Sequence, residues 1–206
     1  MDLTCPRCGS PATPPSDAAG SWRCATHGDI YPLWQVPAVS PQGQAELTAR
    51  AVVPVMLPWP LPDGWLVSGF AAVGAETSGV RGTVVALSGP NPVGGLAEML
   101  LICEELGVGL GAHCAGIEGP DPGADLLACS PHAQVEHGNH EFPLWHVDAP
   151  GCAAFAGEVM GSWLWVLLWP DTAGTMLVEP MRLIDLRDPG QELDLPFGAR
   201  SPRLPG

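Results

Sequence analysis

Short apolar segments of strand length, separated by turn sequences, dominate the chain after about residue 50. Turn sequences rich in Pro, Gly, Asp and Asn occur at residues 58–64, 88–92, 119–123, 171–174 and 188–190. The intervening runs are rich in β-branched, aromatic and leucine residues, which is typical of strands. The pattern predicts strands at residues 52–57, 65–73, 80–87, 143–147, 162–169 and 175–186.

The structures of two further segments are predicted from more than their apolar pattern. In residues 96–106, Leu96, Met99, Leu100 and Cys103 have helical spacing, but the dense apolar run at 99–103 also suits a buried strand, and we favour the strand. The four-residue turn at 171–174 predicts an antiparallel hairpin between the strands before and after it. The fold class expected is therefore α+β, a mostly antiparallel β-rich domain with one or two helices.

The chain divides by composition into a small module and a larger domain. Residues 1–36 carry paired Cys and His residues, and residues 37–44, rich in Pro, Gln and Gly, are interpreted as a linker. Residues 45–206 form the acidic β-rich domain. The predicted organisation is a ribbon, a linker and one ordinary domain, which suits a chain of 206 residues.

Four residues of the first module are spaced as metal ligands. Cys5 and Cys8 form one Cys-x-x-ligand knuckle, Cys24 and His27 form another, and a glycine follows each. Three thiolates and one imidazole complete a tetrahedral set that suits Zn²⁺ and leaves no position for water. We predict one structural zinc ion, because imidazole ligation is uncommon for simple iron–sulfur clusters.

Charge and composition exclude several functions. All 8 basic residues are arginines, so no Schiff-base or phosphate-loop lysine is available. A net charge of −14 makes nucleic acid an unlikely partner, because affinity for it comes largely from neutralising phosphates. No apolar run reaches the roughly 20 residues that span a bilayer, and the first residues lack the features of a secretion signal. We therefore expect a cytoplasmic protein without a membrane span, whose cysteines are metal ligands or buried thiols.

Other candidate groups have simpler interpretations. His132, His137, His140 and His146 lie close in sequence, but loop histidines are a simpler reading than a second metal site. Adjacent His113 and Cys114 would point to opposite faces of an extended chain, which favours an inert thiol. Trp163, Trp165 and Trp169 share one strand face by parity and predict an aromatic stripe facing a core or a partner.

Several motifs stand out along the chain: the two knuckles and the segments at residues 59–65, 109–112, 115–123, 143–146 and 164–170. Together they resemble an uncharacterised family of actinobacterial cytoplasmic proteins with an N-terminal zinc ribbon. The resemblance spans nearly the whole chain and implies an actinobacterial source and the same two-part layout. Some members carry a phosphotransacetylase label, but this chain has no recognisable acyl- or phosphate-binding loop. The resemblance therefore implies no activity.

Two functions remain open from the sequence. The first is a non-catalytic zinc-ribbon module that binds another protein, favoured by the closed metal set and the tryptophan stripe. The alternative is an enzyme or small-ligand binder with a pocket near residues 107–123, using His113 or His146 as its polar group. Binding of nucleic acid through the ribbon would need a basic face that Arg7 and Arg23 alone do not provide.

Overall fold

A single large sheet forms most of the molecule in the computed structural model, which describes residues 3–16, 20–75, 78–123, 126 and 128–206. Its ten strands lie in the order β3-β5-β6-β7-β11-β10-β9-β8-β12-β4. Neighbouring strands are antiparallel except β8 and β12, which are parallel. The strands are β3 (Leu33–Gln35), β4 (Met56–Pro58), β5 (Leu66–Ala75), β6 (Gly79–Pro90), β7 (Leu96–Glu104), β8 (Ala133–His137), β9 (His140–Val147), β10 (Ala153–Val159), β11 (Ser162–Trp169) and β12 (Met181–Asp185).

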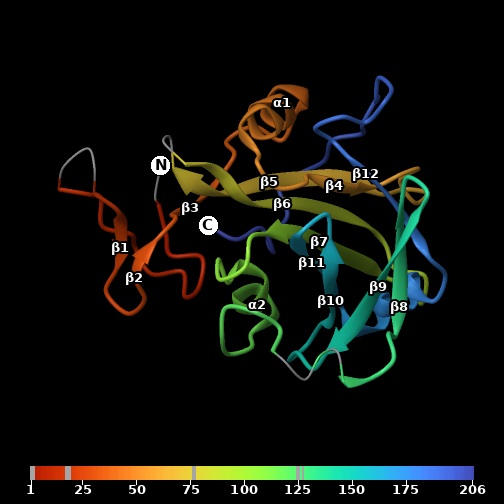
Figure 1. Ribbon diagram of the computed structural model, residues 1–206. Helices are drawn as coiled ribbons and strands as arrows, with labels where there is room; N and C mark the ends of the chain where they lie inside the picture. The colour runs from red at the N-terminus through yellow and green to blue at the C-terminus, as the bar shows by residue number, and fades with distance from the viewer. Residues whose placement is uncertain (1–2, 17–19, 76–77, 124–125, 127) are drawn as a thin grey trace.

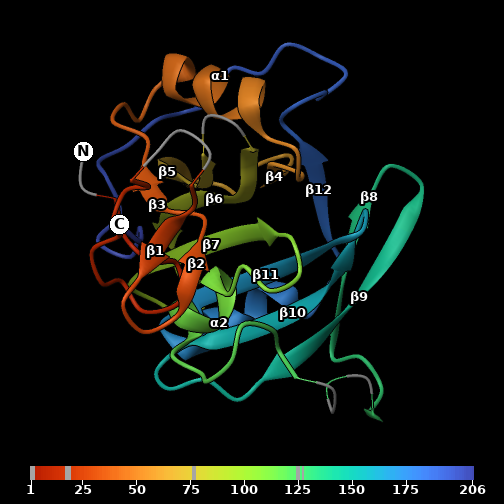
Figure 2. The ribbon, with the colours of Figure 1, turned by 60° about the vertical axis from the view of Figure 1, so that its left-hand side comes forward.

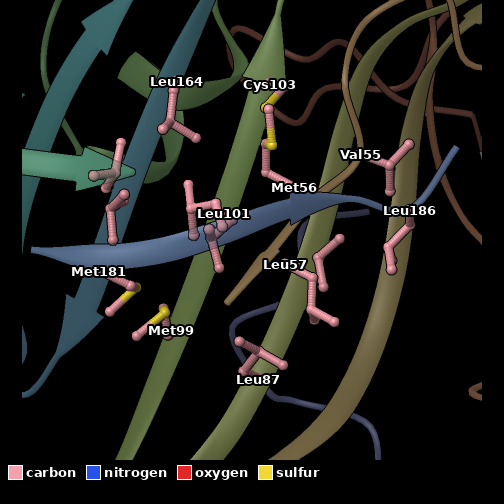
Figure 3. Packing of buried hydrophobic residues seen from close by; sticks show 14 of the residues in the cluster. Val55, Met56, Leu57, Leu87, Met99, Leu101, Cys103, Leu164, Met181 and Leu186 are labelled. Carbon is pink, nitrogen blue, oxygen red and sulfur yellow. The ribbon is translucent and has the colours of Figure 1, made fainter. Parts of the chain in front are cut away.

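The sheet curls so that its last strands lie over the face of the central ones (Figure 1). Figure 3 shows β12 crossing the central strands, with Met181 beside Met99 and Leu57 beside Leu87. The larger of two apolar clusters fills the space between these layers. Because both faces of the central strands are covered, they form continuous apolar runs rather than alternating ones.

The second apolar cluster covers the outer face of the central strands. Trp165 is its largest fully buried side chain, and Leu33, Leu110 and Leu204 bring β3, the helix α2 (Leu110–Ala115) and the C-terminal segment onto the same face. The aromatic stripe of β11 therefore faces a core, with Trp163 and Trp169 partly buried at its margin.

The N-terminal ribbon contains a small two-stranded sheet of β1 (Trp22–Cys24) and β2 (Gly28–Ile30). Figure 2 shows it in front of the large sheet, beside α2. The helix α1 (Pro41–Arg50) follows β3. Ser40 Oγ accepts a hydrogen bond from Gly43 N, and proline stands at the first helical position, both of which favour a helix start.

The sequence-based strand predictions are largely confirmed, including β7, but the predicted hairpin at residues 171–174 is wrong. That stretch is part of the 3₁₀ helix η2 (Asp171–Leu177), in which Ala173 and Leu177 are buried. Strand β11 pairs with β7 and β10, and β12 pairs with β4 and β8. Residues 52–55 and 175–180 are likewise outside the strands predicted there. Across the described residues, every helix is too short or too polar to span a lipid bilayer.

The proposed domain division remains a prediction, to which the structure adds two observations. Strand β3, within residues 1–36, belongs to the large sheet by pairing with β5. Helix α1 begins at Pro41, within the segment interpreted as a linker. The ribbon and the large domain therefore share one hydrogen-bonded framework.

Candidate metal centre and adjoining clefts

Each of the two knuckles is a tight turn that ends on a glycine. In the first, Cys8 N and Gly9 N both donate to Cys5 O, at 3.3 and 2.8 Å. Gly9 has φ +67° and Gly28, which follows the second knuckle, has φ +70°. Other residues adopt this left-handed backbone only at a cost, so the glycines let each turn close and bring its two ligands together.

The four predicted ligands converge on one point. The Cys5, Cys8 and Cys24 sulfurs and a His27 ring nitrogen all lie within 4.8 Å of one another. The Cys5 and Cys24 sulfurs lie 3.5 and 3.6 Å from His27 Nδ1, and the Cys8 and Cys24 sulfurs lie 3.7 Å apart. Tetrahedral Zn²⁺ with ordinary bond lengths requires about 3.6 Å between sulfur and nitrogen and about 3.8 Å between sulfurs. The donor set therefore fits a zinc ion.

The electrostatic surroundings of the thiols differ. Burial raises the pKa of Cys5 to about 12. Burial also acts against ionisation of Cys24, but the backbone N–H groups of His27 and Thr26 outweigh it and lower the pKa of Cys24 to about 6. Cys24 is therefore the thiol best prepared to bind a cation first, and a bound cation would favour the thiolate of Cys5.

The ribbon is joined to the large sheet by a series of backbone bridges. Thr4 and Leu33 exchange two hydrogen bonds, of 3.0 and 2.8 Å, which cover the outer edge of β3. Thr4 also bridges to Pro11, and Thr13 bridges to Arg23 on β1. The pairing thus runs from β3 through the first knuckle to β1 and β2, and the four candidate ligands lie within this ladder.

Arg7 makes a second connection between the ribbon and the domain. Lying between Cys5 and Cys8, it donates from its guanidinium to Gly107 O, and to Val108 O at 3.3 Å. These carbonyls belong to the loop that connects β7 to α2. The same loop is held from its other side, because Gly107 N donates to Asp121 Oδ1 at 3.1 Å.

At the base of this loop lies the buried carboxylate of Glu104, which has no exposed surface. It accepts hydrogen bonds from Leu110 N at 2.7 Å and from Gly111 N at 3.0 Å. Burial raises the pKa of Glu104 to about 7, although these two N–H groups act to lower it. Glu104 thus fixes the start of α2 against the sheet.

Two clefts adjoin the metal centre. The ribbon cleft, about 460 Å³, lies between the β1–β2 sheet and the β7–α2 loop and is lined by residues that include Trp22, Asp29, Tyr31, Glu105 and Leu106. The tail cleft, about 450 Å³, lies between α2 and the C-terminal segment and is lined by residues that include Gly9, His113, Trp169, Arg203 and Leu204. The tail cleft thus includes part of the glycine-rich segment where the sequence suggested a pocket.

The other predicted groups do not form a second centre. Among the described residues, the only Cys, His, Asp and Glu side chains close enough to hold a metal ion are the four ribbon ligands. His132 Nδ1 accepts a hydrogen bond from His146 N, whereas His137 Nδ1 contacts Leu183 O. Burial raises the pKa of Cys114, so its thiol stays protonated and is a poor nucleophile.

Sequence reasoning missed three residues that the structure places beside the ribbon or its clefts. Arg7 was considered only as a positive charge, and Glu104 and Arg203 were not considered. The partners of Arg7 and Arg203 are distant in sequence, so no local spacing could reveal them. For Glu104, a carboxylate before two glycines and a short apolar segment was a weak signal for a buried helix anchor.

One family profile covers nearly the whole chain. The sequence profile of a family of unknown function, DUF6758, matches residues 1–204. The chain belongs to this family. Neither the curated proteins nor the solved structures contain a significant match to the chain. Membership in DUF6758 covers both the ribbon and the curled sheet, so the two parts belong to one family unit.

Proposed function

We propose that this member of DUF6758 is a non-catalytic, zinc-stabilised module that binds another protein in the cytoplasm. The observation that carries the proposal is the closed set of four ligands on a ribbon that is hydrogen-bonded to the domain. A zinc ion held by Cys5, Cys8, Cys24 and His27 would have no open position for substrate or water, so its role would be structural. The free state of all seven cysteines suits a reducing compartment.

Charge supports a protein partner rather than nucleic acid. Six of the eight arginines are held by ion pairs or by backbone carbonyls within the chain, which leaves few cations to neutralise phosphates. Four form ion pairs (Arg23, Arg81, Arg182, Arg187), two donate to backbone carbonyls (Arg7, Arg200) and the other two stack on tryptophans (Arg50, Arg203). The net charge of −14 therefore favours a partner with a basic surface, and association should be salt-dependent.

The ribbon cleft is the surface that best fits such a partner. Leu106 and Tyr31, which line it, are 71% and 40% exposed, although both are largely apolar. The Tyr31 ring is held from one side by the Arg81 guanidinium, 5.5 Å from the ring centroid. Exposed aromatic and aliphatic side chains beside a charged rim are typical of protein interfaces.

Affinity capture with the intact chain as bait tests this function. Partner proteins should be enriched on the wild-type chain and depleted when Leu106→Glu places a charge at the ribbon cleft. Val178→Glu is the matched control, because Val178 is 81% exposed and lies outside both clefts. If no protein distinguishes the Leu106 variant from the control, the ribbon cleft is not the interface.

A second candidate function is small-ligand binding, and the tail cleft favours it. This cleft is of ligand size and contains the half-buried ring of His113, one of the polar groups considered from the sequence. A solvent-accessible imidazole beside an arginine is a suitable group for orienting a polar ligand. This candidate concerns a different surface from the proposed protein interface.

A further inference from the structure

The tail cleft is lined by an arginine and a histidine and by the main chain of the C-terminal segment as far as Gly206. The chain has 22 acidic residues, yet no Asp or Glu side chain lines this cleft. Its lining instead includes Arg203, His113 and the indole of Trp169, with aliphatic surface from Leu204 and Pro150. A pocket that combines a cation, a polar ring and apolar walls suits an anionic ligand with an apolar body.

Arg203 is available for such a ligand. Its guanidinium carbon lies 5.1 Å from the centroid of the Trp169 ring, and the side chain has no ion-pair partner among the described residues. A guanidinium over an indole face makes no hydrogen bond to the ring edge, so its N–H groups can still donate to a carboxylate. The four arginines in ion pairs are already committed to acidic side chains.

His113 supplies the second polar group. Its backbone N–H and C=O are both used within and at the end of α2, bonding Gly109 O and Gly116 N. In the described part of the chain its ring has no hydrogen-bond partner, and Nε2 lies near Gly9 of the first knuckle. Burial lowers the pKa of His113, so the ring is neutral at pH 7 and can donate or accept one hydrogen bond.

The C-terminal segment that carries Arg203 is held in place by contacts within the chain. On one side of Arg203, Ser201 Oγ donates to Glu98 Oε2 at 2.5 Å and Ser201 N donates to Ser68 O at 2.8 Å. On the other side, Leu204 is buried and its carbonyl accepts from Gln35 Nε2 at 3.1 Å. A fixed wall lowers the entropy cost of binding.

We propose that the tail cleft is a binding site for a small organic carboxylate with an aromatic or aliphatic body. The carboxylate is held by Arg203 and accepts a hydrogen bond from His113, and the body lies against Leu204, Pro150 and the edge of Trp169. This proposal develops the second candidate function and is independent of the ribbon cleft and its protein partner.

Titration of the intact, zinc-loaded chain with 2-naphthoate, followed by NMR of the tryptophan indole and histidine imidazole signals, tests the site. The neutral isostere 2-naphthamide is titrated in parallel. The expected result is saturable binding of naphthoate that shifts the Trp169 and His113 signals, with naphthamide bound about tenfold more weakly or worse, the size expected when a charge-assisted contact is lost.

Two variants separate the site from adventitious binding. Arg203→Gln should weaken naphthoate binding about tenfold, whereas Arg50→Gln should leave it unchanged. Arg50 is a matched control because it also stacks on a tryptophan, Trp34, at 5.5 Å, but lines neither cleft. Amide spectra and the melting temperature of each variant show whether it is folded.

Three outcomes would overturn the proposal: no saturable naphthoate binding, equal binding of the amide, or equal weakening by both substitutions. If Arg203→Gln does not fold, His113→Phe is tested in its place. This substitution keeps an aromatic ring but removes the proposed hydrogen bond to the ligand. Naphthoate binding to that variant with unchanged affinity and an unshifted Trp169 signal would also overturn it. None of these results depends on whether Leu106→Glu alters partner capture.

Discussion

The guanidinium of Arg7 contacts the main-chain carbonyl of Gly107, a residue 100 positions further along the chain. Arg7 lies between two of the candidate metal ligands, and Gly107 lies between the buried Glu104 and the helix α2 that Glu104 fixes. The contact therefore connects the metal centre to the outer face of the large sheet. Both residues also line the ribbon cleft.

Replacing Arg7 with methionine should weaken this connection without removing the metal. Arg7→Met keeps an aliphatic stem but removes the donors to Gly107 and Val108, so we expect a loss of about 1–3 kcal/mol in the free energy of unfolding. Amide exchange in residues 105–109 should become faster. Urea denaturation and hydrogen exchange, each with zinc content measured in parallel, check both effects.

Arg23→Met is the matched control, because the Arg23 and Asp29 side chains are 71% and 69% exposed and their atoms lie 3.4 Å apart. An exposed pair of this kind contributes about 0–1 kcal/mol. If both substitutions cost the same, or if exchange in the β7–α2 loop is unchanged in Arg7→Met, the connection has no energetic role.

Removal of zinc should destabilise the whole chain rather than the ribbon alone. Purified protein should carry about one zinc ion per chain, because four ligands complete one tetrahedral site. Cys24→Ser should lose most of the zinc and lower the melting temperature in a single cooperative transition, since Leu33 and Trp34 bury the end of the ribbon in both apolar clusters. Calorimetry with and without chelator measures this.

Cys129→Ser is the control for Cys24→Ser, because Cys129 is an exposed thiol outside the ligand set. It should keep the zinc and the melting temperature of the wild type. Two separate transitions after chelation would show instead that the ribbon is an independent, tethered module. Two zinc ions per chain would point to a second site among the histidines.

The contact of α2 with the sheet has no space for a methyl group. A Cβ on Gly111 would lie 2.2 Å from Cδ1 of Trp165, a fully buried side chain. Gly111→Ala should therefore cost about 1–3 kcal/mol through overpacking. Combining it with Trp165→Phe, which shortens the opposing ring, should recover part of the loss, and a double-mutant cycle from urea denaturation measures the coupling. If the two substitutions change the free energy of unfolding additively, Gly111 and Trp165 are not in energetically significant contact.

Local features of this fold could be predicted from the sequence. Which strands pair with each other in the sheet could not. The two knuckles were legible because ligand spacing and the following glycines are short-range signals, and both glycines have the positive φ that such turns need. Strands β5, β6, β7 and β11 were found because β-branched and leucine runs bounded by turn residues define strands regardless of their neighbours.

The hairpin failed because the sequence does not show which strands pair. A four-residue turn suggested that β11 and β12 are neighbours, but β12 lies across the fold, parallel to β8, and η2 takes up the intervening residues. The start of α1 was in principle readable from Ser40 and Pro41, but the Pro, Gln and Gly content of that stretch favoured a linker.

The raised pKa of Glu104 makes a pH-dependent contribution to stability that can be isolated. Burial favours the protonated carboxyl, so the pKa rises from 4.5 to about 7 on folding. The stabilisation of the protonated form is complete below about pH 4.5 and is lost as the pH rises through about 7. This one group thus makes the folded chain less stable at pH 8 than at pH 5, by up to a few kcal/mol.

Glu104→Gln removes this titration and keeps one of the two acceptor oxygens, because Leu110 N donates to Oε2 and Gly111 N donates to Oε1. The loss of the other acceptor costs the same at every pH. The free energy of unfolding of the variant, minus that of the wild type, should therefore become more positive as the pH rises from about 5 to about 8. Subtracting the wild type at each pH removes the contributions of the histidines and of the metal centre, which both proteins share. Glu46→Gln, on the exposed face of α1, is the matched control for the same chemical change without burial. A constant difference for Glu104→Gln would mean that this carboxylate stays ionised throughout, held by its two backbone donors strongly enough to outweigh its burial.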